Sequence, residues 1–216
     1  MRHGRGALHH NFVVSLLNDL FGIQARGGCS CAGPYGHRLL GIDEETSGRF
    51  HCAITGGMEG IKPGWVRVSF NYFVSEPVFR FMLDAVDFVA THGHKLLPHY
   101  AFDLATGQWR PRRGRPAPAM RLHDLSYRSG KLDYRSRHAT EPEWALEGYL
   151  AEAERIVAET EAELDGASTE SDPALPDDVE ALRWFPLPAD IVAERTNATT
   201  ERRYGIAFGG EDVKRP

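Results

Sequence analysis

The chain has 216 residues, a formal net charge of −5 at pH 7 and 42% hydrophobic residues. This composition is sufficient for an ordinary core in one domain or two small ones, and it excludes a wholly disordered chain. An acidic net charge is atypical of a general nucleic-acid binder. No apolar stretch approaches the roughly 18 residues that a membrane span needs. We therefore expect neither nucleic acid nor a membrane among its partners.

The cysteines and the first residues indicate the compartment. Cys29, Cys31 and Cys52 are odd in number and do not form a disulfide framework. The first residues are basic but lack the apolar core of a secretory signal. A reducing, cytoplasmic location is therefore predicted.

The first periodic segment predicts a helix from Asn11 to Phe21, because its apolar residues recur at helical spacing. Asn11 is the predicted N-cap, and Gly22 is predicted to lie just beyond the last turn. Residues 23–26 are predicted to form a short strand. A flexible glycine-rich loop is predicted over 27–36.

Few periodic apolar positions occur in residues 43–60, which predicts a polar connection. The alternation over 65–70 predicts a strand. Residues 75–92 are predicted to form a second helix, with Ser75 as its N-cap. Residues 96–109 contain a proline and a turn signal, and predict short strands or an extended arm.

Four regions are predicted on this basis. Residues 1–110 form a small domain of the α/β or α+β class, because helix, strand, loop, strand and helix follow in that order. Residues 111–140 form a basic, proline-rich linker, and 141–165 form a helix. Residues 166–216 are an acidic, partly disordered tail, within which 182–192 form an apolar segment that docks on the body.

Two segments carry a resemblance to a known family. The sequence Arg-Gly-Gly-Cys-Ser-Cys-Ala-Gly-Pro at 26–34 follows the first helix, and Gly-Trp-Val-Arg-Val-Ser-Phe-Asn-Tyr at 64–72 precedes the second. Together they resemble the C-terminal domain of class V aminotransferases. These are fold-type-I pyridoxal-phosphate enzymes, and they include cysteine desulfurases and selenocysteine lyases. The resemblance covers residues 8–92, continues more weakly to about 110, and returns at 182–188.

The resemblance implies roles for three residues. Arg67 would bind the α-carboxylate of an amino-acid substrate through two parallel hydrogen bonds. Arg26 would lie near the cofactor or substrate. Cys31 matches the desulfurase cysteine, whose thiolate becomes a persulfide. However, Cys29-Ser30 stands where desulfurases often have His-His, so Cys31 could instead be a packing residue. Without the resemblance, the two arginines would be interpreted as pairing with surface acids or bracing the loop.

The resemblance also implies pyridoxal phosphate, which is held by a lysine Schiff base. The segment ending at Lys95 partly resembles the cofactor-lysine signature. We interpret this match as coincidental, because His92 stands where a small residue is expected and the segment is predicted to be helical. The cofactor would then belong to a large domain upstream of the matching part. The isolated chain is therefore expected to be inactive. In the intact enzyme, it would form a homodimer or associate with a separate large domain.

Three functions remain open. The first is that of a pyridoxal-phosphate enzyme acting on an amino acid, by transamination or by desulfuration. The second is that of a noncatalytic remnant or interaction module that needs a separate cofactor domain. The third is that of a small metal-binding regulator built on Cys29, Cys31 and His37. No metal is expected, because this spacing lacks the second close pair that structural zinc sites usually show.

Overall fold

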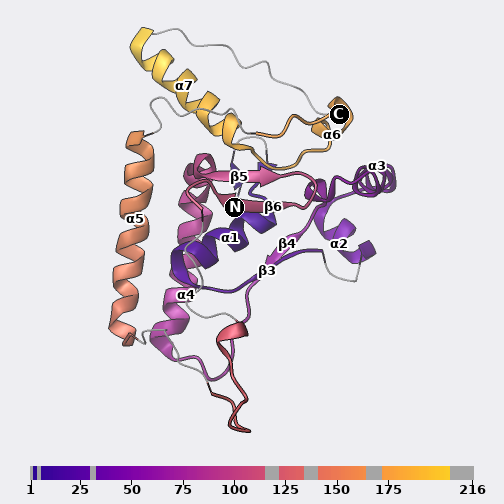
Figure 1. Cartoon of the computed structure of the whole chain (residues 1–216). Coiled ribbons are helices and arrows are strands. Elements are labelled where there is room, and N and C mark those ends of the chain that lie inside the picture. Colours follow the sequence, from indigo (N-terminus) through magenta and orange to yellow (C-terminus); the bar gives the residue numbers. More distant parts are fainter. Residues whose placement is uncertain are drawn as a thin grey trace.

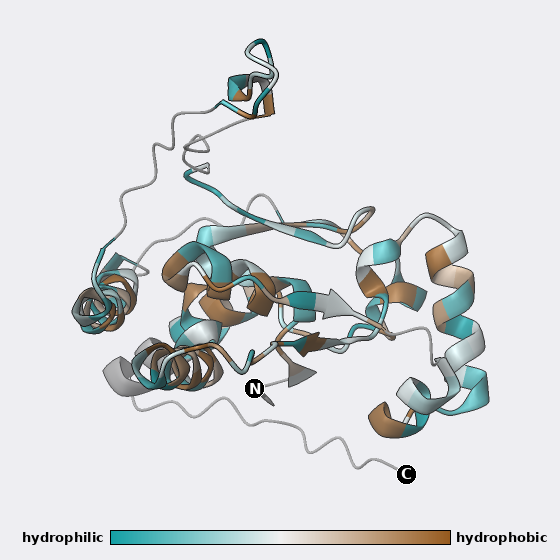
Figure 2. Cartoon of the chain, turned by 90° about the horizontal axis from the view of Figure 1, so that it is seen from below, coloured by the Kyte–Doolittle hydropathy of each residue, from teal (hydrophilic) through white to brown (hydrophobic). Residues whose placement is uncertain are grey.

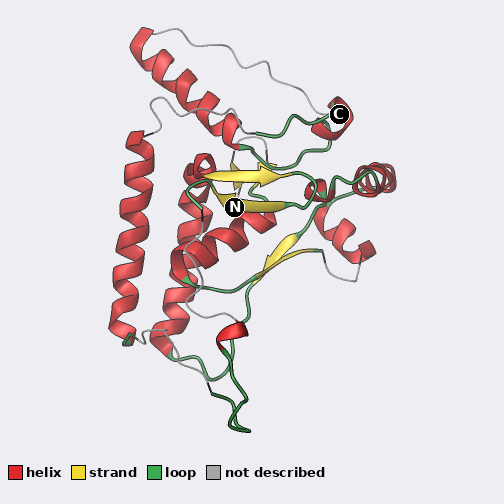
Figure 3. Cartoon of the chain, viewed as in Figure 1, coloured by secondary structure: helices red, strands yellow, loops and turns green. Residues whose placement is uncertain are grey.

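The computed structural model describes residues 2–3, 6–29, 33–114, 122–133, 141–163 and 172–204. Within these ranges helices predominate, and the named strands form two-stranded antiparallel ribbons, β1–β2, β3–β4 and β5–β6 (Figure 3). In chain order the elements are β1 (Arg2–His3), β2 (Gly6–Ala7), α1 (His10–Phe21), β3 (Arg26–Gly28), α2 (Gly33–Leu40), α3 (Glu44–Thr55), the 3-10 helix η1 (Glu59–Ile61), β4 (Trp65–Arg67), α4 (Glu76–His92), η2 (Gly93–His99), β5 (Tyr100–Asp103), β6 (Gln108–Pro111), η3 (Leu122–Asp124), η4 (Glu143–Ala145), α5 (Leu146–Glu163), α6 (Asp177–Glu180) and α7 (Pro188–Tyr204). The fold is therefore mixed, as expected, with the described strand pairs in the antiparallel arrangement of an α+β protein.

Helix α1 lies at the centre of the molecule (Figure 1). Its residues Phe12, Leu16 and Leu17 have no exposed surface. The helix packs against β3, β4, β6, α4 and α5. The long helices α4 and α5 stand side by side on one flank, whereas α2 and α3 lie on the other.

The ends of α1 confirm one predicted cap and correct the other. Gly22 ends the helix with φ of 65°, in the left-handed region that glycine adopts most readily. The N-cap is His9 rather than Asn11, because the His9 side chain accepts a hydrogen bond from the backbone N–H of Asn11 at 3.2 Å. The Asn11 side chain instead donates to the carbonyl of Gly107 at 2.8 Å.

The segment after α1 differs from the prediction. Ile23 is buried and bonds back to the carbonyl of Leu17 at 2.9 Å, which closes the end of the helix. The strand therefore begins only at Arg26. Helix α2 also occupies part of the region predicted to be a flexible loop.

Helix α3 replaces the polar connection predicted over 43–60. Its N-cap is Asp43, whose carboxylate accepts from the backbone N–H of Thr46 at 2.7 Å. The helix buries only Phe50 and Ala53. So short an apolar stripe gives almost no periodic signal, which explains the wrong prediction.

In the second half of the first domain, the structure agrees more closely with the predictions made from the sequence. Strand β4 ends at Arg67, three residues before the predicted end. Helix α4 begins after Ser75, whose hydroxyl accepts from the N–H of Val78 at 3.4 Å, as predicted. The strands predicted within 96–109 form the β5–β6 hairpin, which turns at Gly107 with φ of 67°.

Helix α5 lies inside the region predicted as helical. It buries Ala153, Val157 and Thr160, and Leu146, Leu150 and Ile156 pack against the core. Trp144, which precedes the helix, is 79% exposed. Helix α7 was not predicted, because the region was interpreted as an acidic tail. Its first turn is fixed by the Asp190 carboxylate, which accepts from the N–H of Leu187 at 2.8 Å.

Residues 182–192, which we term the strap, pack onto the body of the protein. Phe185 is fully buried. The indole N–H of Trp184 donates to the carbonyl of Ile61 at 3.0 Å, and the Trp184 carbonyl accepts from the N–H of Ala7 at 3.1 Å. The strap therefore joins the N-terminal ribbon to the segment before β4.

The hydropathy of the chain agrees with this packing. In a view from below, hydrophobic stretches gather on the inner faces of the central elements (Figure 2). None of the helices in the described part of the chain combines the length and the apolar character needed to cross a membrane.

The burial of Phe185 yields a test of the strap. Phe185→Ala should lower the free energy of unfolding by about 3–5 kcal/mol, because it leaves a cavity in a closed aromatic cluster. Urea unfolding followed by circular dichroism measures this change. Trp144→Ala, which removes an exposed aromatic residue, is the control and should change stability by less than about 0.5 kcal/mol. An equal effect of the two substitutions would contradict the assignment of the strap to the core.

Candidate functional site

Arg26 and Arg67 lie directly opposite one another across the β3–β4 ribbon. Opposite residues of an antiparallel pair point to the same face, so both arginine side chains leave the ribbon on that face. Both residues are exposed. Among the described residues, no carboxylate forms an ion pair with either arginine. We call these two residues the arginine pair.

In the absence of a bound anion, the arginine pair destabilises the ribbon. Like charges directly opposite one another destabilise a ribbon, by an amount of the order of 0.2–1 kcal/mol. An anion held between the two guanidinium groups would remove this repulsion and gain charge-assisted hydrogen bonds. The geometry therefore favours binding of a carboxylate or a similar anion.

Close backbone approaches fix the position of the ribbon. The face at Gly27 lies against α1, where an added Cβ would come within 2.6 Å of the Asn11 side chain. The chain at Gly64 also approaches the backbone of Gly28, to 2.6 Å from an ideal Cβ. Larger residues would push the strands apart and away from α1. The glycines thus hold the arginine pair on the face that points away from α1.

His9 and His10 are both buried, and their rings stack at 4.3 Å between centroids. Since Nδ1 of His9 accepts from Asn11, its Nε2 carries the proton and donates to the carbonyl of Gly60 at 3.0 Å. His9 therefore serves as the N-cap of α1. His10 stacks on Trp184 of the strap, and its buried Nδ1 has no partner among the described residues.

The environment of these histidines opposes a positive charge. Burial first, and then the neighbouring His10, lower the pKa of His9 well below its usual value, against the opposing effect of the bond to Gly60. Burial first, and then the charge of Lys62, lower the pKa of His10 to about 4. Both rings are therefore neutral at pH 7.

A cavity of about 200 Å³ lies between the end of the ribbon and helices α2 and α3. Cys29 lies on its wall, directly after β3, and is exposed. Cys31, the residue that matches the desulfurase cysteine, lies outside the described residues. The polar and aromatic residues around the cavity include Cys29, His37, Ser47, His51, Lys62 and Trp65. Sequence analysis had considered two of these residues. Cys29 was named as a neighbour of Cys31, and Cys29 and His37 were named as candidate metal ligands.

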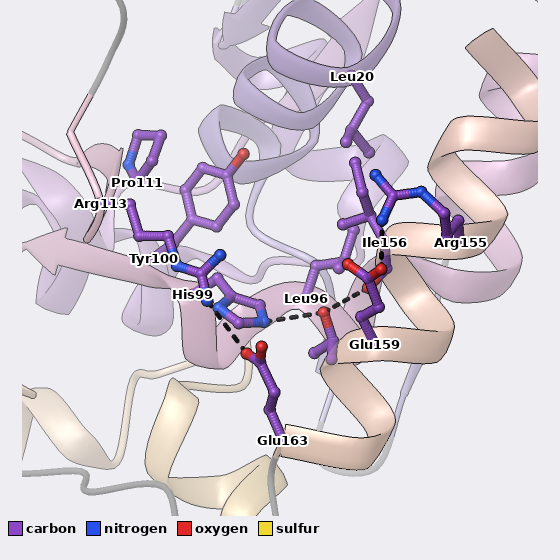
Figure 4. Close-up of a pocket in the computed structure, with 11 residues that line it drawn as sticks. Leu20, Leu96, His99, Tyr100, Pro111, Arg113, Arg155, Ile156, Glu159 and Glu163 are labelled. Atoms are coloured by element: carbon purple, nitrogen blue, oxygen red, sulfur yellow. Dashed lines mark hydrogen bonds and ion pairs between the residues drawn. The ribbon is translucent and has the colours of Figure 1, made fainter. Parts of the chain in front are cut away.

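A second cavity of about 300 Å³ lies between the β5–β6 hairpin and α5 (Figure 4). The hydroxyl of Thr160 donates to the carbonyl of Ile156 at 2.7 Å, so His99 must donate from Nε2 to Thr160, at 2.8 Å. Arg113 pairs with Glu163 at 3.2 Å. The charged side chains on this wall pair with one another. The cavity is therefore a gap in the packing of α5 against the hairpin, and not a strong anion site.

The arginines after β6 have structural partners. Arg112 donates to the carbonyl of Pro98 at 2.9 Å and pairs with Asp172 at 3.3 Å. Arg112, within the segment predicted to be a basic linker, is therefore attached to neighbouring groups of the protein. Burial first, and then the charge of Arg113, lower the pKa of His99 beside it.

Pyridoxal phosphate, the cofactor that the resemblance implies, needs a lysine whose amine can become neutral. The Lys62 amine lies 2.8 Å from Glu59, and the hydrogen bond to Glu59 raises its pKa. The Lys95 amine lies 2.9 Å from Glu161, on the opposite flank from α2 and α3. Lys131 is exposed, and Lys214 lies outside the described residues. The described lysines therefore do not fit a Schiff-base site, whereas the arginine pair fits the carboxylate of a substrate.

A metal site is also not supported by the described residues. Within them, no three His, Cys, Asp or Glu side chains gather as a group that could hold a metal ion. The proposed metal-binding set also needed Cys31, whose position is not described.

None of the protein families, curated proteins or solved structures compared with the chain matches it.

The buried histidines predict a pH dependence of stability. As pH falls from about 6.5 to 4, the unfolded chain binds a proton at His10 that the folded protein does not, so stability decreases with acidification. The contribution of this group should reach roughly 3 kcal/mol at pH 4. His10→Phe keeps a ring against Trp184 and should flatten the dependence of the urea midpoint on pH. His51→Gln, which removes an exposed histidine, should leave that dependence unchanged. An unaltered slope in His10→Phe would argue against this role.

Proposed function

We propose that the β3–β4 ribbon binds the carboxylate of an amino-acid substrate in a pyridoxal-phosphate enzyme of the class V aminotransferase and cysteine desulfurase type. In this proposal, the cofactor lysine belongs to a separate domain or subunit. The register that pairs Arg26 with Arg67 carries the proposal. The proposal draws its cofactor and reaction class from the resemblance, and its binding step from the geometry of the arginine pair.

Two arginines on one face suit a carboxylate for physical reasons. A guanidinium group is planar and always charged, and it offers parallel N–H donors that match the two carboxylate oxygens. Two such groups can hold one carboxylate from both sides and fix the direction of the bond to Cα. Orientation of this kind lowers the barrier of a reaction at the amino group or side chain, because the reacting atoms are already aligned.

Each group has a distinct role in this scheme. Pyridoxal phosphate, when bound, would supply the electron sink for chemistry at the substrate amine. Arg67 would bind the α-carboxylate, and Arg26 would orient the same group from the neighbouring strand. Transamination and desulfuration need the same carboxylate contact. Cys31 would take part only in desulfuration.

One observation favours a second candidate function, that of an interaction module without catalysis. The loop after β4 carries three aromatic residues with large exposed surfaces, namely Phe70, Tyr72 and Phe73, and Tyr72 is fully exposed. Exposed aromatic clusters commonly mark sites of contact with other proteins. Such a module would not need the arginine pair to bind a carboxylate.

Titration with L-alanine and with propionate tests the carboxylate site. The arginine Nε–Hε resonances of Arg26 and Arg67 should shift in nuclear magnetic resonance spectra as either ligand is added. Arg67→Gln should weaken binding by roughly 10- to 100-fold, because a charge-assisted hydrogen bond contributes about 1.5–3 kcal/mol. The variant should remain folded, since removal of one like charge relieves repulsion across the ribbon.

Arg110→Gln provides the matched control for this titration. Arg110 is also an exposed strand arginine, but it lies on β6 and bonds to Gln108. Its loss should leave ligand binding unchanged. Equal effects of Arg67→Gln and Arg110→Gln, or no shift in the wild-type protein, would reject the carboxylate site and favour the interaction module.

A further inference from the structure

The cavity at α2 and α3 opens on the same face of the ribbon as the arginine pair. Side chains two residues apart on a strand point to one face and lie about 7 Å apart. Trp65 stands two residues before Arg67, and it lies on the wall of the cavity. Its ring lies against Gly36 of α2, 3.0 Å from an ideal Cβ there. Gly27, on the alternate face, contacts α1 instead.

The arginine pair and the cavity therefore form one continuous surface. The pair lies at one end of the ribbon. The other end, where Trp65 pairs with Gly28, leads to Cys29 and into the cavity. A ligand held by its carboxylate on the arginines could extend along the ribbon and place its other end between α2 and α3.

The wall of the cavity indicates the chemistry of that other end. Trp65, Phe50, Leu40 and Ile54 provide apolar surface, and the pocket volume of about 200 Å³ corresponds to roughly seven water molecules at about 30 Å³ each. Filling such a space with an apolar group releases this water. A flat ring beside the Trp65 indole would also gain aromatic contact.

The described wall of the cavity carries one ammonium group and no acidic side chain. Lys62 contributes the ammonium group, and His37 and His51 contribute imidazole rings. The Lys62 ammonium group donates a hydrogen bond to Glu59. Since an ammonium group has three N–H donors, it can also donate to a second partner.

We infer that this cavity is a subsite for the side chain of the ligand whose carboxylate binds the arginine pair. The ligand class is an amino acid with a ring-bearing side chain that ends in a carboxylate. The ring would lie beside Trp65, and the terminal carboxylate would meet Lys62. This inference rests on the proposed function for the carboxylate end alone.

A small aliphatic amino acid would use the surface poorly. Its carboxylate could bind the arginine pair, but its side chain would leave the apolar wall beside Trp65 in contact with water. Only a ligand with a longer side chain therefore gains binding free energy from the subsite. The expected order of affinity is 4-carboxy-L-phenylalanine, then L-phenylalanine, then L-alanine.

Cys29 reports on occupancy of the cavity, with Cys52 as an internal reference. Both cysteines are exposed, but only Cys29 belongs to the cavity wall. Iodoacetamide would be added to the full chain with and without each ligand, and each cysteine would be quantified by peptide mass spectrometry. Saturating 4-carboxy-L-phenylalanine should slow alkylation of Cys29 about tenfold and leave the rate at Cys52 unchanged.

Two variants separate the subsite from the carboxylate site. Ser47→Leu places a larger side chain on the cavity wall, and it should abolish the preference for ring-bearing ligands while alanine still binds. Lys62→Gln should reduce the affinity for 4-carboxy-L-phenylalanine to that for L-phenylalanine. Arg49→Leu is the control, since it changes an exposed residue of the same helix α3 that is not part of the cavity wall.

The outcomes distinguish the inference from the proposed function. Equal affinities for all three ligands, all lost in Arg67→Gln, would overturn the subsite and leave the carboxylate site in place. Binding of 4-carboxy-L-phenylalanine that protects Cys29 but persists in Arg67→Gln would overturn the shared ligand and the proposed function together. Absence of binding by any ligand would overturn both. The expected order of affinity, with its loss in Ser47→Leu, its partial loss in Lys62→Gln and its retention in Arg49→Leu, supports the inference.

Discussion

The burial of helix α1 is the constraint on which the rest of the structure depends. A helix with Phe12, Leu16 and Leu17 fully buried must be covered on several sides, and elements distant in the sequence provide the cover. The hairpin contributes Trp109, whose ring packs on Phe12 and whose carbonyl accepts a bond from Ser15 at 3.2 Å. The ribbon β3–β4 covers another side of the helix. The core therefore sets the orientation of the ribbon. Because Gly27 faces α1, Arg26 and Arg67 on the alternate face point away from that helix.

Two features of the candidate site are unfavourable for folding alone. Arg26 and Arg67 repel one another across the ribbon, and His10 keeps a buried nitrogen without a partner among the described residues. Such departures from the usual rules cluster at functional sites, where a ligand or a reaction compensates for them. The arginine pair is accessible to a ligand, whereas His10 lies beneath Trp184. The first feature therefore supports a binding role, and the second concerns the packing of the strap.

The sequence predicted the elements with strong periodicity and clear caps, as in α1, α4 and the β5–β6 hairpin. It did not predict α3 or α7, because helices with narrow apolar stripes are stabilised by tertiary packing more than by local preference. The resemblance singled out Arg26 and Arg67 as residues of a site. Their direct opposition could not be predicted, because the register of two three-residue strands is set by contacts with α1. The cavity beside Cys29 was also missed, since much of its wall comes from α2 and α3, two helices that were not predicted.

The bond between Ala7 and Trp184 has a consequence for synthesis of the protein. Its two partners lie near opposite ends of the chain, so the entropy of closing almost the entire chain must be overcome before this contact forms. Translation proceeds at roughly 5–20 residues per second, and the rings of His9 and His10 stay without their cover until the strap has been made. During that interval the growing chain exposes aromatic surface that the finished protein buries. This contact therefore forms only after the strap has been synthesised.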